Sequence, residues 1–348
     1  MVHTHTHTHT HTPITIVNSI MGIKHLNQFV RRECPGAIKT VTFADLAGKT
    51  VVVDASIYMY RFMADQALLE NMYSMITMFQ LRGIVPIFIF DGKPPIEKRN
   101  ILNKRNRMKR IAETHYNHVK NAMNLTRTPD YEQLLKTLKR RFIRLQDADF
   151  ERVKALMQAL GVDYIVAPGE ADALCAQMVL KHKAHACLSD DTDMFVHGCP
   201  RVLRDINLFD ETMTMYNMSQ ILALLGMTMT EFRQICVISG TDYNSGPMHG
   251  LNLKVALHLF GQYKKYRQDA EESGDVFAPD FCTWLHHNGD QVTGNRIHFN
   301  YDNIVEICNM FDAAAMPNQL SLVYHHFNTR DDELLHKIMA HENFIFVP

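Results

Sequence analysis

The chain has 348 residues, a formal net charge of −1 and 46% hydrophobic residues, enough to bury a large core in one big domain or in one domain with a satellite. No apolar run reaches the ~20 residues that span a bilayer, so we expect no membrane partner. The seven cysteines are an odd number and form no CxxC pair, which predicts reduced thiols in an intracellular protein and excludes a cysteine-based zinc site.

A low-complexity segment, residues 1–20, opens the chain, with alternating His and Thr over residues 3–12. It lacks the apolar residues of a core, and His at every second position can capture immobilised metal, so we interpret it as an affinity tag and linker. A native His-rich tail is the alternative. We expect the folded part of the chain to start at Met21.

Beyond Met21, short runs rich in Val, Ile and Phe alternate with amphipathic stretches. The runs predict buried strands at residues 50–53, 85–90, 164–166, 186–188 and 202–203. The amphipathic stretches predict helices at residues 57–81, 150–160, 171–180 and 219–225. This alternation predicts an α/β fold with a mainly parallel central sheet flanked by helices on both faces. After Asp242 we expect helices and loops only.

A long polar segment, residues 96–148, interrupts the alternation and predicts a helical insertion. Residues 93–144 contain fifteen Lys and Arg against four Asp and Glu, a local charge of +11. A run of charge is usually a solvated helix face. A basic arm beside acidic residues, however, is typical of a protein that holds a polyanion near bound cations.

Acidic residues gather where the predicted strands end. They are Asp54, Asp91, Glu170, Asp172, Asp190, Asp191 and Asp193. The carboxyl ends of parallel strands meet at one edge of the sheet, so these side chains are expected to converge. One such acid would simply cap a helix, but capping does not explain acids at three strand exits and a further pair. Gathered carboxylates coexist when a cation neutralises them or when some are protonated, so the pattern predicts a cation site.

Six motifs follow one another along the chain: MGIKHL from Met21, VVVDAS around Asp54, FIFDGKPP around Asp91, APGEADALCA around Glu170, SDDTD around Asp193 and SGTDY around Asp242. In order and spacing, over residues 21–259, they resemble the flap endonuclease (XPG-like 5′ nuclease) family, including a divergent or viral member. The resemblance implies a PIN-like 5′ nuclease fold with a helical arch and a helix-turn-helix hairpin. We therefore expect nuclease-domain parts at residues 21–95 and 149–245, an arch at 96–148, a duplex-binding hairpin at 246–270 and a helical region at 271–348.

The resemblance also implies a set of metal ligands. They are Asp54, Asp91, Glu170 and Asp172 for a first ion and Asp191, Asp193 and Asp242 for a second, some through water. The family usually has Glu where Asp172 stands, so this ligand is one methylene shorter. Carboxylate oxygens favour Mg²⁺, with Mn²⁺ as a substitute, over Zn²⁺. Two such ions ~4 Å apart would clamp a phosphodiester in line and leave a 5′-phosphate and a 3′-hydroxyl.

Two basic residues, Lys98 and Arg105, fall where the family has catalytic residues at the base of its arch. They are two helical turns apart, so both can face the metals and stabilise charge on the transferred phosphate. Lys104 is expected to contact a phosphate from the same helix. Tyr60 falls where the family has a Tyr that stacks on a nucleobase, an interaction of about 1–3 kcal/mol. The alternatives are a solvated helix for the cations and a core position for the Tyr.

The stretch GLNLKVAL from Gly250 resembles the family's duplex-gripping hairpin, with Gly250 and Lys254 as nucleic-acid contacts. Asn252 stands where the family has a second Gly, and Asn adopts the left-handed conformation better than most residues. The change leaves a K⁺ site at the hairpin an open alternative. The terminal NFIFVP lacks the Gln and adjacent aromatics of a sliding-clamp motif, so no clamp partner is expected.

Together these features predict a monomeric 5′-flap endonuclease and 5′→3′ exonuclease that acts on branched or 5′-flap DNA in replication or repair. An RNA endonuclease similar to viral host-shutoff nucleases is the alternative, because TDMFVHGCPRVLRDI resembles their equivalent stretch too. A catalytically silent binder of branched DNA is a third, which the complete set of acids disfavours. The compartment is expected to be nuclear or, for a viral member, cytoplasmic.

Overall fold

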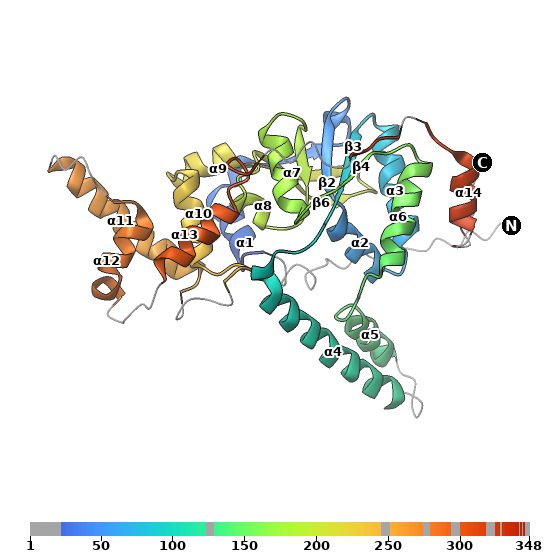
Figure 1. Cartoon of the computed structure of the whole chain (residues 1–348), viewed down its shortest axis with the longest axis horizontal. Helices are drawn as coiled ribbons and strands as arrows, with labels where there is room; N and C mark the ends of the chain where they lie inside the picture. Colours follow the sequence, from blue (N-terminus) through green and yellow to red (C-terminus); the bar gives the residue numbers. More distant parts are fainter. Residues whose placement is uncertain are drawn as a thin grey trace.

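A central eight-stranded sheet organises the molecule (Figure 1). The computed structural model describes residues 22–122, 129–244, 251–273, 279–293, 300–317, 324–327, 329–340, 342 and 344. Residues 1–20 and Gly250 lie outside the described residues, so the tag and this hairpin glycine are not tested. The strand order is β1-β7-β6-β5-β2-β3-β4-β8.

The strands are β1 (Ile38–Thr42), β2 (Thr50–Asp54), β3 (Val85–Phe90), β4 (Tyr164–Val166), β5 (Ala186–Leu188), β6 (Arg201–Asn207), β7 (Thr212–Asn217) and β8 (Tyr324–His325). The helices are α1 (Leu26–Glu33), α2 (Ala55–Ala64), α3 (Leu68–Leu81), α4 (Arg99–Ala122), α5 (Pro129–Lys139), α6 (Asp147–Ala159), α7 (Ala171–Leu180), α8 (Asp193–Val196), α9 (Met218–Leu225), α10 (Met229–Ile238), α11 (Leu253–Glu272), α12 (Phe281–Thr293), α13 (Tyr301–Met310) and α14 (Asp332–Ala340). Short 3₁₀ turns are η1 (Pro35–Ala37), η2 (Ala44–Leu46) and η3 (Ile96–Lys98).

The five predicted strands are confirmed as the parallel centre of the sheet, β6-β5-β2-β3-β4. The edges are antiparallel: β1 pairs with β7, β7 with β6, and β8 with β4. The expectation that no strand follows Asp242 is therefore wrong, because the two-residue β8 joins the sheet edge. The predicted helix at residues 57–81 is two helices, since the chain breaks at Gln66, whose φ is 59°.

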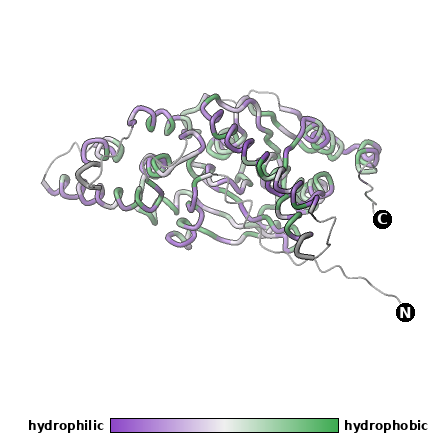
Figure 2. Tube along the Cα trace, turned by 90° about the horizontal axis from the view of Figure 1, so that it is seen from below, coloured by the Kyte–Doolittle hydropathy of each residue, from purple (hydrophilic) through white to green (hydrophobic). Residues whose placement is uncertain are grey.

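Alternate side chains of the central strands enter two separate cores. Val51 and Val53 of β2 face the core formed with α2, α3, α6 and α14. Val52 faces the larger core, to which α1 and α7 to α13 contribute. Alternation of this kind follows from the two-residue period of a strand. In the helices that cover the sheet, hydrophilic and hydrophobic residues alternate along the chain (Figure 2). This pattern is typical of amphipathic helices.

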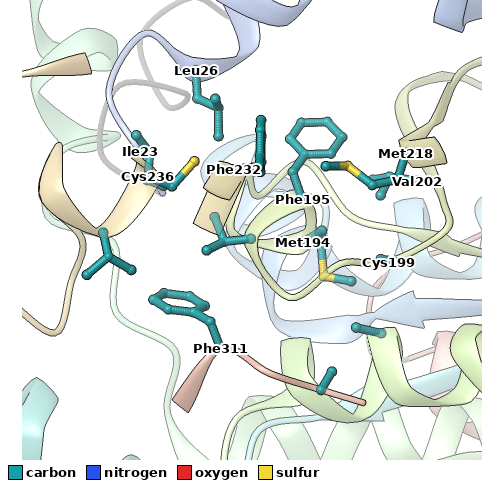
Figure 3. Packing of buried hydrophobic residues seen from close by; sticks show 14 of the residues in the cluster. Ile23, Leu26, Met194, Phe195, Cys199, Val202, Met218, Phe232, Cys236 and Phe311 are labelled. Atoms are coloured by element: carbon teal, nitrogen blue, oxygen red, sulfur yellow. The ribbon is translucent and has the colours of Figure 1, made fainter. Parts of the chain in front are cut away.

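Figure 3 shows part of the larger core, where Phe195 of α8, Phe232 of α10 and Phe311 at the end of α13 gather. The C-terminal helices are thus packed onto the rest of the fold through buried aromatic side chains. Within the described residues, no single helix is long and apolar enough to cross a membrane; α9 and α10 meet that requirement only when joined across an 82° bend.

The predicted helical insertion is confirmed as α4 and α5, which project from the body as an arm (Figure 1). Their packing uses the rings of Tyr116 and Phe142, with centroids 5.3 Å apart. An ion pair of 2.9 Å joins Arg144 to Glu113. The base of the arm, η3 and the first turns of α4, reaches the carboxyl ends of the parallel strands.

Candidate active site

The predicted acids lie at the carboxyl ends of four parallel strands. Asp54 is the last residue of β2, Asp91 follows β3, and Glu170 precedes α7 after β4. The loop after β5 carries Asp191 and leads into α8 at Asp193. Their charges act on one another, because Asp91 and Asp191 both raise the pKa of Asp54. The expected convergence of sequence-distant carboxylates is therefore observed.

Four of these carboxyls hold their protons more tightly than usual: Asp54 and Asp193 are buried, and Asp172 and Asp191 are half-buried. Burial, followed by the charges of Asp91 and Asp191, raises the pKa of Asp54 to about 8. Burial and neighbouring carboxylates also raise the pKa of Asp172 and Asp193 well above the usual value, and burial raises that of Asp191. Asp172 and Asp193 each have an Oδ1 atom that is buried without a hydrogen-bond partner. Desolvated carboxylates without compensation are costly, and either protons or a bound cation can neutralise them.

Hydrogen bonds fix the orientation of the acids at the strand ends. Asp54 accepts from the backbone N–H of Ile57 at 3.4 Å and from Ser189 Oγ at 3.2 Å. Asp91 accepts from the backbone N–H of Ala171, at the start of α7, at 2.9 Å. The capping role considered for single acids therefore exists for Asp54, but the same side chain also belongs to the cluster.

The segment at Gly22 packs directly on the acidic loop, a contact that the MGIKHL motif alone does not predict. Gly22 has a φ of +73°, and a Cβ atom there would lie 2.4 Å from Asp191 Oδ1 and 2.1 Å from Thr192 Oγ1. The N–H of Ile23 donates to the same Thr192 Oγ1 at 2.8 Å. Only glycine fits this close approach of backbone to carboxylate.

Lys98 and Arg105 reach the carboxylates from the arm. Lys98 is 7% exposed, and its Nζ lies 2.6 Å from Glu170 and 4.0 Å from Asp242. Arg105 donates to Asp242 Oδ2 at 2.6 Å. Burial alone would lower the pKa of Lys98, but the charges of Glu170, Asp193 and Asp172 raise it above its usual value. A solvated helix face is thus the wrong description of Lys98.

Tyr60 and Lys104 differ in their surroundings. Tyr60 is partly buried, and its ring lies 5.0 Å from Nζ of Lys109. Burial, followed by the charge of Asp91, raises the pKa of Tyr60, so the ring stands at the rim of the acidic cluster. Lys104 is exposed on α4. Stacking on a base and contact with a phosphate stay predictions for these two residues.

The hairpin segment is described from Leu251 onward. Lys254 is exposed in the first turn of α11, where it can meet solvent or phosphate. Asn252 is extended, with a φ of −126°, and its side chain accepts from Val255 N–H as the N-cap of α11. The left-handed conformation considered for Asn252 is therefore wrong, because Asn is used as a helix cap.

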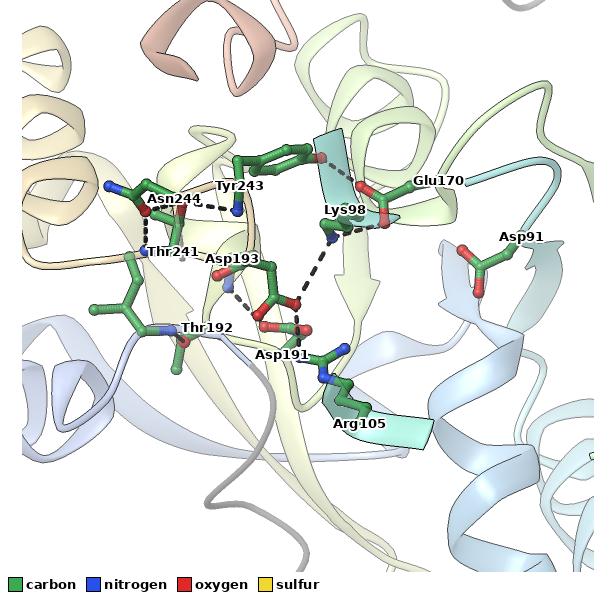
Figure 4. A network of polar contacts seen from close by, with 12 residues as sticks. Asp91, Lys98, Arg105, Glu170, Asp191, Thr192, Asp193, Thr241, Tyr243 and Asn244 are labelled. Atoms are coloured by element: carbon green, nitrogen blue, oxygen red, sulfur yellow. Dashed lines mark hydrogen bonds and ion pairs between the residues drawn. The ribbon is translucent and has the colours of Figure 1, made fainter. Parts of the chain in front are cut away.

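Tyr243 is a site residue for which the sequence predicts no role, although it ends the SGTDY motif. Its hydroxyl donates a hydrogen bond to Glu170 Oε2, and its ring centroid lies 4.7 Å from Lys98 Nζ (Figure 4). Burial and the charge of Glu170 raise the pKa of Tyr243. Only its place beside Asp242 could have pointed to it.

No three His, Cys, Asp or Glu side chains in the described residues form a ready-made metal site. Two of the carboxylates, Glu170 and Asp242, are engaged by Lys98 and Arg105 instead. The chemistry of the cluster nevertheless fits a hard divalent cation, because its donors are carboxylate oxygens and two buried oxygens lack partners. The assignment of seven acids as metal ligands stays a prediction.

Comparisons with known proteins bear on the same regions. The family model of the XPG N-terminal domain matches residues 21–112, and that of the XPG I-region matches residues 161–242. The chain is 30% identical to flap endonuclease 1 of Ostreococcus lucimarinus over 322 residues, 87% of this chain and 79% of the relative. It is also 30% identical to flap endonuclease 1-B of Oryza sativa subsp. indica over 262 residues, 70% of this chain and 62% of the relative.

Solved structures share the fold. The catalytic core of Rad2 in complex with a DNA substrate matches with a TM-score of 0.60 and 21% identity, over 89% of this chain and 92% of that one. Flap endonuclease-1 from Methanococcus jannaschii matches with a TM-score of 0.56 and 24% identity, over 88% and 90%. Human GEN1 in complex with Holliday junction DNA matches with a TM-score of 0.58 and 17% identity, over 92% and 73%.

The predicted carboxylates and the base of the arm all lie within the two matched ranges, the last of which ends at Asp242. A relative that is 30% identical across 79% of its own length shows the family directly. The chain belongs to the flap endonuclease (XPG-like) family of structure-specific 5′ nucleases.

Proposed function

We propose that the protein is a Mg²⁺-dependent 5′-flap endonuclease and 5′→3′ exonuclease that hydrolyses DNA in replication or repair. One observation carries the proposal: carboxyls gathered at the ends of four parallel strands, with Asp54 and Asp193 buried among them, face two cations from a basic arm. The carboxylate oxygens are the ligands that a divalent cation prefers. The neighbouring positive charges can bind the phosphates of a nucleic acid.

Two metal ions would be held by the seven predicted ligands. Asp54, Asp91, Glu170 and Asp172 would bind the first, and Asp191, Asp193 and Asp242 the second. Bound Mg²⁺ supplies a water of lowered pKa and stabilises negative charge on the leaving oxygen. The two partnerless oxygens of Asp172 and Asp193 support this assignment, because a cation would give both a partner.

The chain's own residues would bind and orient the phosphate. Lys98 is charged and buried beside the carboxylates. Arg105 pairs with Asp242, the same carboxylate that lies 4.0 Å from Lys98. In a water-poor site, fixed cations stabilise charge on a transferred phosphate more strongly than they would in bulk water. The remaining cations of α4 and α5 would hold the backbone of the strand through sequence-independent phosphate contacts.

Branched or 5′-flap DNA is the substrate class that the relatives support. The Rad2 core was solved with a DNA substrate and human GEN1 with a Holliday junction, and both share this fold. Exposed Lys254 at the start of α11 would contact the duplex. We further propose that the protein acts as a monomer. We also propose a reducing, intracellular compartment, since none of the seven cysteines forms a disulfide.

Cleavage of end-labelled substrates tests the proposal. The panel contains a 5′-flap DNA, the same duplex without a flap and a single-stranded RNA, each with Mg²⁺ and with EDTA. The Asp193→Ala protein, purified in the same way, controls for contaminating nucleases. Preferential Mg²⁺-dependent cutting at the flap junction is expected. Strong cutting of RNA with little cutting of the flap would refute DNA as the substrate, and silence with tight flap binding would refute the activity.

A further inference from the structure

Tyr243 lies between the buried lysine and its carboxylate partner. Nζ of Lys98 is 4.7 Å from the centroid of the Tyr243 ring, and the Tyr243 hydroxyl donates to Oε2 of Glu170. The other carboxylate oxygen of Glu170, Oε1, is 2.6 Å from the same Nζ. Ring, ammonium and carboxylate therefore form a closed set of three contacts (Figure 4).

The backbone that carries Tyr243 is fixed by side chains on either side. Thr241 Oγ1 accepts from the N–H of Tyr243 at 3.2 Å. Asn244 Oδ1 accepts from Thr241 Oγ1 at 2.8 Å, and Asn244 Nδ2 donates to the carbonyl of Val237 at 2.7 Å. These bonds tie the turn to the last turn of α10, so the Tyr243 ring has a defined starting position.

Phe311 supports the ring from behind. The two rings meet edge to face, with centroids 5.0 Å apart and planes at 90°. Phe311 is fully buried at the end of α13 and also packs on His197, 4.9 Å away, which directly follows α8. An edge-to-face aromatic pair is attractive beyond the burial of its area, because the positive edge of one ring meets the negative face of the other. The C-terminal region thus forms the back wall of the site.

An aromatic ring suits a lysine that must remain available to a phosphate. Cation–π attraction in a desolvated site amounts to about 2 kcal/mol, enough to restrict the ammonium group without neutralising it. A further carboxylate in place of the ring, in addition to Glu170 and Asp242, would reduce the positive charge available to the phosphate. The Tyr243 hydroxyl meanwhile restricts Glu170, so that one side chain orients two partners of opposite charge.

We propose that Tyr243 is a positioning residue that holds the Lys98 ammonium group and the Glu170 carboxylate in place, with Phe311 as its support. This inference rests on the proposed function, because it assigns Tyr243 an effect on the chemical step through Lys98. It extends the active site to a residue of the SGTDY motif and to a buried side chain of the C-terminal region.

A double-mutant cycle tests the link between Tyr243 and Lys98. The variants are Tyr243→Phe, Tyr243→Leu, Lys98→Ala and the double variant Tyr243→Leu/Lys98→Ala, compared by single-turnover cleavage of 5′-flap DNA with Mg²⁺. Tyr243→Leu is expected to lower the rate about 10- to 30-fold, the equivalent of the cation–π attraction, with little change in DNA affinity measured in EDTA. Tyr243→Phe keeps the ring and should lose no more than about threefold.

The cycle is decided in the Lys98→Ala background. If Tyr243 acts through Lys98, Tyr243→Leu should change the rate there by less than about threefold. The same factor of loss in both backgrounds would overturn the proposal. So would equal losses in Tyr243→Phe and Tyr243→Leu, because the ring would then have no role. Tyr324→Leu is the matched control: Tyr324 also donates to a carboxylate, Asp163, at 3.1 Å, but lies on β8.

A measurement without turnover separates this inference from the proposed function. The Tm of the parent, Tyr243→Leu, Lys98→Ala and the double variant is measured in EDTA. The shifts in Tm should be non-additive, with Tyr243→Leu lowering Tm less in the Lys98→Ala background than in the parent. Additive Tm shifts would contradict the contact itself. A parent that fails to cut 5′-flap DNA but shows the non-additive Tm shifts would refute the proposed function and leave the Tyr243–Lys98 contact standing. Phe311→Leu should shift rate and Tm in the same direction as Tyr243→Leu, by less.

Discussion

Ionisation of Asp54 should visibly lower the stability of the metal-free protein. It is 5% exposed, and burial with two neighbouring carboxylates raises its pKa to about 8. In the unfolded chain the pKa is about 3.9. The folded state therefore binds the proton more tightly, and its stability is highest below about pH 4 and is lost as pH rises toward 8.

Asp54→Asn removes this loss while keeping the shape of the side chain. Each pH unit between folded and unfolded pKa corresponds to about 1.36 kcal/mol, which gives an upper limit of about 4 kcal/mol at pH 7. Asn can still cap α2 by accepting from the Ile57 N–H through Oδ1, while its Nδ2 donates to Ser189 Oγ, but its amide is buried at a cost of about 1–3 kcal/mol. We expect a net gain of about 1–3 kcal/mol at pH 7.

Urea unfolding in EDTA at pH 5, 6.5 and 8 measures the effect. The stability gain of Asp54→Asn should grow with pH and should shrink when Mg²⁺ is added, because the metal stabilises the parent by binding its native state. Asp147→Asn, an exposed acid in the first turn of α6, should change stability by less than about 0.5 kcal/mol at every pH. A variant less stable than the parent at all three pH values would refute the reasoning.

Four further substitutions test the site and the arm. Asp191→Ala and Asp193→Ala should each lower the Mg²⁺-dependent cleavage rate by orders of magnitude, about 10³-fold or more, while circular dichroism shows an unchanged fold; normal turnover in both would contradict the two-metal assignment. Lys98→Ala should slow single-turnover cleavage about 10²-fold or more and change DNA affinity little, whereas a loss confined to affinity would return Lys98 to a role in binding. Lys104→Ala should reduce the slope of log affinity against log salt by about 0.7–0.9, as expected for one lost phosphate contact, with an unchanged slope arguing against that contact.

The central strands and the acids at their ends are predictable from the sequence, whereas the sheet edges are not. Buried parallel strands such as β2 are continuous apolar runs, and the two-residue period sends Val51 and Val52 to opposite cores. The edge strand β1 and its neighbour β7 have few buried positions and contain Lys, Thr and Asn, so no apolar run marks them. β8 is two residues long and depends on tertiary pairing with β4.

The same limit applies to the candidate site. Asp54 and Asp91 can be placed from sequence because a strand exit fixes where a side chain points. The contacts of Tyr243 and Gly22 depend on loops that approach from distant parts of the chain, α10 and the start of α1. The periodicity of apolar residues does not predict contacts between distant loops. A motif identifies the residues involved but not the contacts that they make.

Charge balance within the cluster indicates where a cation is required. Lys98 pairs with Glu170 and Arg105 with Asp242, so the arm already compensates two carboxylates. Four others have raised pKa values and, among the described residues, no ion-pair partner: Asp54, Asp172, Asp191 and Asp193. Protons can neutralise these four at low pH, but at neutral pH ionisation is favourable only with a divalent cation between them. Under the proposed function, metal binding should therefore release protons, and the arm's cations and the metals would divide the same set of carboxylates between them.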